Sequence, residues 1–395
     1  MREGWVETTL DGIADYINGY PFKPADLGED GLPVIRIKQL LDPNEPVDRT
    51  ETDTPDRCLL RDGDIVFSWS GTLAVRIWNR GPAKLNQHLF RVVEKKGVYK
   101  GIIPLILDHA IEELEEKSHG TTMKHITKQT LLPHKVLLPP LPEQKRIVDL
   151  ISSVDSYIEA LQQQLESSKR SRNAVLHELL TAGGDDWIET TLGEICADGL
   201  FADGDWVESK DQDPEGDYRL LQLADIGDGT FLNKSDRWMN REQFNRLGCT
   251  KLEVNDVLIA RMPDPIGRAC LLPEGLPVCA TVVDVAIVRT GNETLQKFLA
   301  LLINSSDFRT EAFSLLTGTT RQRISRGNLA KISFVIPSQE KQLEIVNLIS
   351  LFDGEIAQSV RVIEEAKQLR SGLLSDLLSG EHEIPASYDK VMGAA

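Results

Sequence analysis

The chain is a tandem repeat, and this duplication limits the folds that are open to it. Residues 5–10 recur as residues 187–192, and residues 120–182 recur without gaps as residues 318–380, with about 20 identities over the longer match. Solenoid repeats have periods of roughly 20–50 residues, far shorter than this spacing. The 395 residues are enough for about two to three domains. We therefore expect two homologous domains, each followed by the same connector.

Each connector is predicted to be one long helix. Residues 143–180 contain neither Gly nor Pro, and Gly183 and Gly184 follow, as is typical of a helix C-terminus. Apolar residues recur at alternating steps of four and three, which is the heptad pattern of a coiled-coil seam. In the first connector they are Ile147, Ile151, Val154, Ile158, Leu161, Leu165, Val175 and Leu179, and in the second they are Ile345, Ile349, Phe352, Ile356, Ile363, Leu373 and Leu377. Arg172 and Arg370 occupy the same seam position in the two connectors.

Two equivalent seams in one chain favour their packing on each other, because a lone helix with a narrow apolar stripe rarely stays unpaired. Since the globular parts alternate with the helices, we predict an antiparallel coiled coil with one globular part at each end. About 38 residues at ~1.5 Å per residue give a helix of about 57 Å. The alternative is that each helix packs separately on its own domain.

The globular parts show an α+β pattern. Extended segments are expected near residues 34–37, 65–67, 89–93 and 135–138, and helices near residues 104–117 and 295–316. The predicted fold class is therefore α+β, with two homologous globular domains alternating with two long helices that pair as an antiparallel coiled coil. The expected boundaries are 1–141 for the first domain, 142–184 for the first helix, 185–338 for the second domain, 339–380 for the second helix and 381–395 for a C-terminal tail.

Charge and hydropathy exclude several classes of protein. Lys and Arg number 44 against 61 Asp and Glu, which gives a net charge of −17. This balance argues against a basic nucleic-acid coat or a polybasic membrane binder, but it leaves room for local basic patches. The apolar runs are far shorter than the ~18 residues of a membrane span, so no membrane contact is expected. Five scattered cysteines indicate free thiols in a reducing, cytoplasmic location.

The sequence predicts no catalytic residues, no metal site and no cofactor bound by this chain. It lacks a phosphate-binding G-x-x-x-x-G-K-[ST] loop, the zinc motif H-E-x-x-H and the nucleophile motif G-x-S-x-G. An amino-methyltransferase needs a polar residue before a Pro-Pro pair, whereas Pro139 and Pro140 lie between Leu138 and Leu141. The seven histidines have no metal-ligand spacing.

Two basic, Thr-containing segments at equivalent positions in the repeat are the first candidates for DNA binding. Residues 121–135 and 319–331 contain Lys, Arg or His and no acid. Lys and Arg neutralise phosphates, hydroxyl groups bind the backbone, and Arg and Gln can pair with base edges. The candidates are Thr121, Thr122, Lys124, His125 and Lys128 in the first copy, and Thr319, Thr320, Arg321, Gln322, Arg323 and Arg326 in the second. The alternative is a basic loop that only aids solubility.

Polar groups beside the predicted strands are the second set of candidates. They are Ser68, Trp69, Ser70, Thr72, Asn86, Gln87 and His88 in the first copy, and Arg261, Asp264 and Arg268 in the second. An Arg can bind a guanine edge and an Asp can accept from a cytosine amino group. The alternatives are hydrogen-bonded turn residues in the first copy and pairing of Arg261 with Asp264 in the second.

Several of these features together resemble a known family. Each domain opens with Trp-x-Glu-Thr-Thr-Leu and closes with Gly-Thr-Thr-x-x-x-Ile, and residues 139–148 form the run Pro-Pro-Leu-Pro-Glu-Gln-Lys-Arg-Ile-Val at the start of the first helix. Residues 18–23 and 34–37 are also similar to the opening of many target-recognition domains. The chain resembles the specificity subunit of a type I restriction–modification system over residues 1 to about 380. The second copy departs at residues 337–342, which lack the second Pro.

The resemblance implies a function that the residues alone do not. Each target-recognition domain would recognise one half of a bipartite, asymmetric site in double-stranded DNA. The paired helices would set the spacing and dock two modification subunits, which bind S-adenosylmethionine and methylate adenine. Two restriction subunits that use ATP and Mg would complete an endonuclease, and this chain would be non-catalytic by itself. The alternative, which the net charge of −17 favours, is a coiled-coil scaffold that joins two protein-binding domains.

Overall fold

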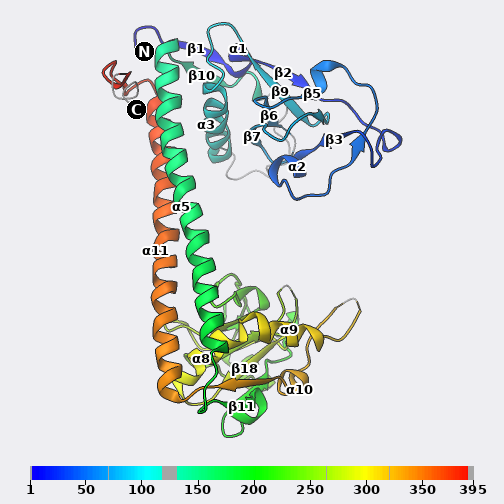
Figure 1. Ribbon diagram of the computed structural model, residues 1–395, viewed down its shortest axis with the longest axis vertical. Helices are drawn as coiled ribbons and strands as arrows, with labels where there is room; N and C mark the ends of the chain where they lie inside the picture. The colour runs from blue at the N-terminus through cyan, green and yellow to red at the C-terminus, as the bar shows by residue number, and fades with distance from the viewer. Residues whose placement is uncertain (1, 70, 118–130, 264, 320, 390–395) are drawn as a thin grey trace. The chain divides into compact units, whose positions relative to one another are not determined.

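The computed structural model describes residues 2–69, 71–117, 131–263, 265–319 and 321–389 (Figure 1). The chain forms two compact units. The first comprises Met1–Gln163 and Arg361–Ala395, and the second comprises Gln164–Val360. Each unit therefore holds one globular domain together with a part of both long helices, α5 (Leu141–Thr181) and α11 (Gln339–Leu378).

The described residues of the first unit form three small sheets. Its strands are β1 (Val6–Thr9), β2 (Ala14–Asn18), β3 (Leu32–Ile35), β4 (Arg49–Thr50), β5 (Leu59–Leu60), β6 (Ile65–Ser68), β7 (Ala74–Ile77), β8 (Ala83–Leu85), β9 (Leu89–Glu94) and β10 (Lys135–Leu138). Its shorter helices are α1 (Leu10–Ile13), α2 (Ile37–Leu41) and α3 (Ile102–Lys117), with 3-10 turns η1 (Pro24–Asp26) and η2 (Asp56–Cys58). The strand orders are β2-β9-β6-β7, β4-β3-β8-β5 and β1-β10. All pairs are antiparallel except β3 with β8.

The second unit repeats this topology. Its strands are β11 (Ile188–Thr191), β12 (Leu200–Asp203), β13 (Tyr218–Leu221), β14 (Trp238–Met239), β15 (Val257–Ala260), β16 (Ala269–Leu271), β17 (Cys279–Thr281), β18 (Val285–Arg289) and β19 (Ser333–Ile336). Its shorter helices are α6 (Leu192–Ile195), α7 (Arg241–Leu247), α8 (Glu293–Ile303), α9 (Ser306–Ser314) and α10 (Arg326–Leu329), with 3-10 turns η3 (Ser209–Asp211) and η4 (Leu223–Asp225). The orders β12-β18-β15-β16 and β11-β19 match those of the first unit, and β14-β13-β17 matches β4-β3-β8, with no counterpart of the edge strand β5 among the described residues. The pair β13 with β17 is again the parallel one. The predicted α+β mixture of two homologous domains is confirmed.

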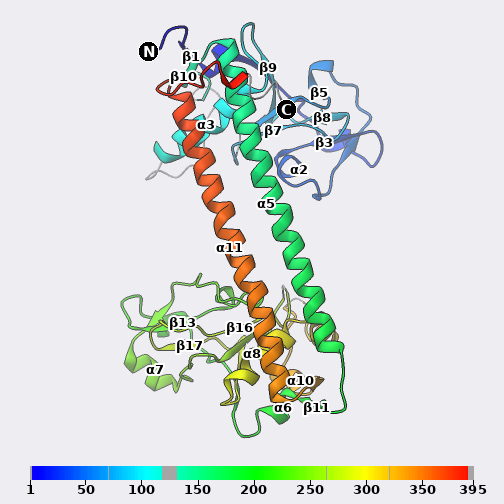
Figure 2. The same cartoon turned by 60° about the vertical axis from the view of Figure 1, so that its left-hand side comes forward.

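Both long helices contribute to the core of each unit (Figures 1 and 2). In the first unit, Ile147 and Ile151 near the start of α5 share one apolar cluster with Leu374 and Leu377 near the end of α11. The reciprocal cluster of the second unit contains Leu176 and Leu180 of α5 with Ile345, Val346 and Ile349 of α11. Each helix end is thus anchored by the burial of apolar side chains against a globular domain.

A reciprocal ion pair joins the two helices within each unit. In the first unit Arg370 Nε lies 2.6 Å from Asp155 Oδ1, and in the second Arg172 Nε lies 2.8 Å from Asp353 Oδ1. The repeat makes Asp155 equivalent to Asp353 and Arg172 equivalent to Arg370. The arginine that occupies the equivalent seam position in each helix therefore forms an ion pair with an aspartate of the other helix.

The corner between each domain and its helix is held by an equivalent buried Gln. Gln144 Nε2 donates to the Pro139 carbonyl at 2.8 Å, and Gln342 Nε2 donates to the Pro337 carbonyl at the same distance. Pro139 and Pro337 are also equivalent in the repeat. The second copy keeps this corner although it lacks the second Pro.

The sequence-predicted segments agree with the structure in most places. Strand 135–138 is reproduced, and the helix expected at 104–117 begins two residues earlier as α3. The single helix expected over residues 295–316 is wrong, because it is two helices, α8 and α9. The break has a physical cause: the Ser305 side chain accepts from Phe308 N and begins a new helix.

Candidate nucleic-acid interface

The basic segment of the second unit forms an exposed hairpin. Thr317 and Arg323 exchange two backbone hydrogen bonds of 3.0 Å, and Gly318 provides the left-handed conformation that the turn requires (φ +96°). The side chains of Thr319, Arg321, Gln322 and Arg323 are exposed. Among the residues that the structure describes, Arg321 makes no ion pair, so its guanidinium is available to a phosphate or a base edge. Thr320 lies outside the described residues.

The end of strand β15 lies directly against this hairpin. Ile324 is fully buried, and its backbone N–H donates to the Arg261 carbonyl at 2.9 Å. The structure therefore brings together two candidate regions that are about 60 residues apart in the sequence. Arg326, at the start of α10, is half exposed and donates to the Phe201 carbonyl at 3.0 Å.

Arg261 is a buried support rather than an exposed contact, which corrects the sequence-based assignment. Its side chain is only 3% exposed. Its Nη1 donates to the Asp203 carboxylate, and its Nε donates to the Ile324 carbonyl at 3.0 Å. Burial lowers the pKa of its guanidinium, and the Asp203 charge opposes that shift. The described partner is Asp203, whereas Asp264 lies outside the described residues.

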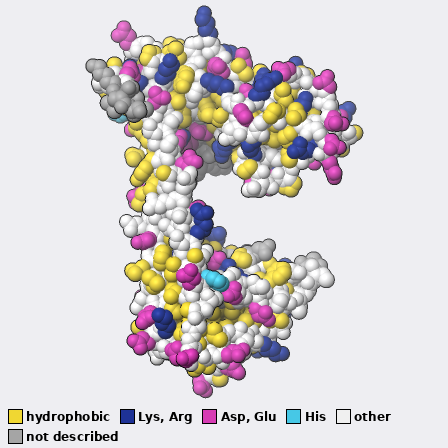
Figure 3. Space-filling view, viewed as in Figure 1, with side chains coloured by type: hydrophobic (Ala, Val, Ile, Leu, Met, Phe, Trp, Pro, Cys, Tyr) yellow, Lys and Arg dark blue, Asp and Glu magenta, His cyan; other side chains and the backbone are white. Residues whose placement is uncertain are grey.

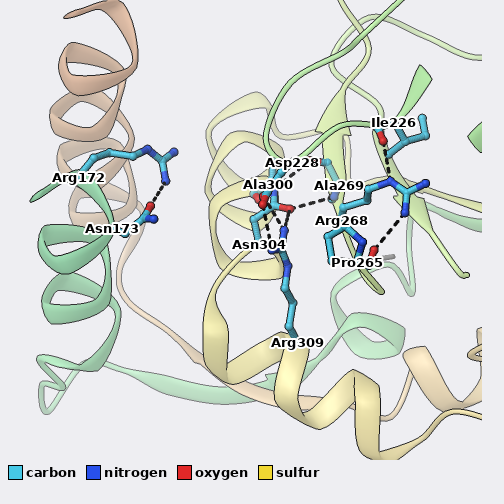
Figure 4. Close-up of polar contacts among 10 residues, drawn as sticks. All are labelled: Arg172, Asn173, Ile226, Asp228, Pro265, Arg268, Ala269, Ala300, Asn304 and Arg309. Atoms are coloured by element: carbon cyan, nitrogen blue, oxygen red, sulfur yellow. Dashed lines mark hydrogen bonds and ion pairs between the residues drawn. The ribbon is translucent and has the colours of Figure 1, made fainter. Parts of the chain in front are cut away.

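Arg268 is also engaged within the protein. Its guanidinium donates to the backbone carbonyls of Ile226 at 2.7 Å and Pro265 at 3.1 Å (Figure 4). It also donates to the carbonyls of Leu223 at 3.2 Å and Met262 at 3.5 Å. This arrangement uses its donors to hold the loop that follows β15. Direct contact of Arg268 with a base is therefore not what the geometry favours, and it too is corrected to a supporting residue.

The candidates of the first unit lie at the equivalent corner, where β6 ends and β9 begins. Ser68 pairs with Leu89 across these two strands. The side chain of Ser68 is fully buried, and its hydroxyl donates to the Thr72 carbonyl at 2.6 Å, so Ser68 closes a turn and does not face solvent. Asn86 is only 6% exposed, and its Oδ1 accepts from His88 N at 3.3 Å, so it also acts as a turn residue.

Three other candidates in this corner are exposed. They are Thr72, Gln87 and His88, and the Gln87 and His88 side chains lie 3.3 Å apart. Trp69 is half-buried, with its ring stacked on Phe90 at 5.5 Å between centroids. Ser70, Thr121, Thr122, Lys124, His125 and Lys128 lie outside the described residues.

Acidic side chains near the arginines were missed from the sequence. Asp203 lies beside both Arg261 and Arg326, and Asp284 Oδ1 is 3.5 Å from Arg323 Nη1. No sequence signal marks these partners, because each comes from a distant strand or loop. Acidic and basic side chains are interspersed on the visible face of both units (Figure 3). The Arg321 side chain is exposed although the net charge of the chain is negative.

The five cysteines are free, as the sequence predicts, and all five are buried. Burial raises the pKa of the thiols, to about 11 for Cys196, Cys249 and Cys279 and about 12 for Cys270, and it also raises that of Cys58. Within the described ranges, no three His, Cys, Asp or Glu side chains are arranged to hold a metal ion. The described helices include none with the length and apolar character needed to cross a bilayer.

Comparison with known proteins gives a consistent result. A family model described as "Type I restriction modification DNA specificity domain" matches residues 2–167 and 184–368. The EcoBI specificity subunit of Escherichia coli is 24% identical, with 99% of this chain and 92% of that protein covered. The MjaVIII specificity subunit of Methanocaldococcus jannaschii is 22% identical, with 97% and 94% covered. A chain from a structural study of type I R-M complex assembly and conformational transition has the same fold, with a TM-score of 0.61 at 17% identity and with 97% and 99% covered.

Proposed function

Because the chain belongs to the type I restriction–modification DNA specificity family, we propose that it is the subunit that recognises DNA sequence in such a complex. Each target-recognition domain binds one half of a bipartite, asymmetric site in double-stranded DNA. The chain itself is non-catalytic and cytoplasmic. It works with adenine-methylating modification subunits and ATP-dependent restriction subunits.

The repeated domain with different exposed side chains at one corner supports this proposal best. At that corner the first unit exposes Thr72, Gln87 and His88, and the second exposes Arg321 and Arg323. Phosphate contacts position a protein on DNA, whereas contacts to base edges distinguish sequences. One scaffold with two sets of exposed polar groups suits two different half-sites.

The helices α5 and α11 set the distance between the two half-sites in this proposal. Their shared cores and the pairs Arg370–Asp155 and Arg172–Asp353 support an antiparallel coiled coil. Exposed apolar side chains, including Leu343 and Leu351 of α11, leave surface for two modification subunits. We assign S-adenosylmethionine to those subunits, and ATP and Mg to two restriction subunits.

The first experiment is to sequence methylated bases in host DNA with and without this gene. Loss of one bipartite adenine-methylation motif on deletion is expected. A duplex carrying that motif is then offered to the complex of this chain with its modification subunits, and salt-sensitive, motif-specific binding is expected.

Two results would contradict the proposal. One is an unchanged methylation pattern together with a complex that assembles but binds all duplexes equally. That outcome would favour the coiled-coil scaffold. The other is methyl transfer by the purified chain alone, which would make it an enzyme.

A further inference from the structure

An apolar patch lies beside the arginine hairpin of the second unit. Phe313, in the last turn of α9, is 64% exposed. Together with Pro263, Pro265, Ile266, Thr310 and the side chain of Arg309 it lines a shallow cavity of about 290 Å³. A single exposed aromatic residue needs no explanation, but an exposed Phe grouped with two prolines is a surface that a ligand could cover.

Two arginines anchor the segments that carry the patch, and their polar contacts are drawn in Figure 4. Arg268 holds the loop that carries Pro263 and Pro265 by donating to the Pro265 carbonyl at 3.1 Å. Arg309 anchors α9, because its guanidinium reaches Asp228 at 3.0 Å and Asn304 Oδ1 at 2.7 Å. The patch is thus preorganised, which lowers the entropic cost of binding.

The patch is continuous with the hairpin through both of its arms. The Phe313 carbonyl accepts from Leu316 N at 3.2 Å, one residue before the hairpin begins at Thr317. On the other side, Pro263 follows two residues after Arg261, whose carbonyl accepts from Ile324 N. The hairpin that carries Arg321 and Arg323 is therefore joined to the patch through two short backbone segments, one on each arm.

DNA fits this combination of a cationic hairpin and a small apolar patch. The thymine C5-methyl is the apolar group that the base edges present in the major groove, and Phe is one of the residues that contact it. A protein partner buries about 800 Å² on each side of a stable interface, more than this patch alone offers.

We propose that Pro263, Pro265 and Phe313 form a contact for a thymine methyl group in the half-site that the second domain binds. The inference rests on the proposed DNA-reading function and names one chemical feature that the second domain recognises. Arg268 and Arg309 are positioning residues for this contact. Phe313 is the aromatic side chain of the three and is 64% exposed.

The test uses the complex of the full chain with its modification subunits and duplexes that carry the methylation motif. Each thymine is replaced in turn by deoxyuridine, which lacks only the C5-methyl. At one or more positions of the second half-site, loss of the methyl group is expected to raise the dissociation constant about fourfold. This factor corresponds to the free energy of burying one methylene-sized apolar group. The Phe313→Ala variant is expected to bind the thymine and uridine duplexes equally.

Two control variants separate the methyl contact from other effects. Trp206→Ala removes another exposed aromatic of the second unit that is 70% exposed, and it should keep the fourfold discrimination. Arg321→Ala should weaken binding to the thymine and uridine duplexes by the same factor. If Phe313→Ala fails to fold, Pro265→Ala and Phe313→Ser are measured instead, with thermal unfolding as the check.

The outcomes distinguish this inference from the proposed function. If the complex binds its motif but no uridine in the second half-site weakens binding, the methyl contact is wrong and the DNA-reading function stands. If Phe313→Ala instead prevents assembly with the modification subunits, the patch is a protein contact and the inference is overturned. If the unaltered complex shows no motif-specific binding, the proposed function fails as well.

Discussion

Asp108 of α3 is expected to make the stability of the first unit depend on pH. Burial raises the pKa of its carboxyl to about 6. Arg370 and Arg76 oppose this shift, whereas Glu112 and Asp155 add to it. Asp108 thus lies near the Arg370–Asp155 pair that joins the two long helices.

The sign of the effect follows from the direction of the shift. Because the folded pKa is above the ordinary value of 3.8, the folded state binds the proton more tightly than the unfolded state between pH 3.8 and about 6. The free energy of unfolding therefore falls as the pH rises through this window, and it stays low above pH 6. A shift of roughly two pKa units corresponds to about 3 kcal/mol, which is an upper bound because the side chain keeps some contact with solvent.

The variant Asp108→Asn removes the ionised carboxylate and should recover this free energy. Calorimetry of the full chain at pH 4 to 8 measures it, with separate transitions expected for two compact units. At pH 7 the melting temperature of the first unit should rise by several degrees, with about 6–12 °C as the upper bound. Near pH 4 the gain should be small.

A control variant and two results decide whether this reasoning holds. Asp185→Asn changes an exposed carboxylate in the segment after α5 and should shift neither transition at any pH. A gain from Asp108→Asn that is equal at pH 4 and pH 7 would refute the electrostatic cause. A lower melting temperature at pH 7 would mean that Arg370 and Arg76 stabilise the carboxylate more than burial destabilises it.

Three further predictions concern DNA recognition, spacing and the thiols. Replacing Arg321 and Arg323 by Ala should weaken or relax recognition of one half-site, as measured in binding assays with separately altered half-sites. The slope of the logarithm of the binding constant against the logarithm of the salt concentration should also fall in magnitude by about one for each lost phosphate contact. Equal loss at both half-sites would contradict two independent domains. Deleting residues 157–163 and 355–361 together removes the same length from both helices and keeps both interhelical ion pairs. Methylation sequencing should then show a gap between half-sites that is shorter by about 3 bp. An unchanged gap would exclude the helices as the spacer. The buried cysteines should resist a thiol reagent at pH 8 until the protein is unfolded, and fast labelling of the native protein would contradict their burial.

The parts of the fold that could be predicted are those with a strong local or repeated pattern. The heptad spacing located α5 and α11, because apolar periodicity over about 40 residues leaves few other structures open. Strand β10 was located by a short apolar run that ends at Pro139. The break between α8 and α9 was missed, because Ser305 can lie within a helix or cap one and tertiary contacts decide between them.

The candidate site was predicted less well, because residues distant in the sequence determine whether a side chain is buried and whether it is free to contact DNA. Arg261 and Arg268 have the chemistry of base-reading residues, yet both guanidinium groups bind backbone carbonyls of the protein. Phe313 had no motif around it and became visible only when α9 packed beside the loop of Pro263 and Pro265. A sequence shows which side chains can bind DNA, whereas the fold decides which of them face solvent.

The two interhelical ion pairs connect the duplication to the proposed spacing function. The same Asp and the same Arg occur in each copy, and each Arg pairs with the Asp of the other copy. In the proposed antiparallel pair of homologous segments, one favourable contact therefore occurs twice, because both copies keep the same Asp and the same Arg. A length change in one helix alone would shift one pair out of register, whereas equal changes in both helices keep both pairs. Under the proposed function, the duplicated sequence would let the gap between half-sites change in matched steps while each domain kept its own recognition surface.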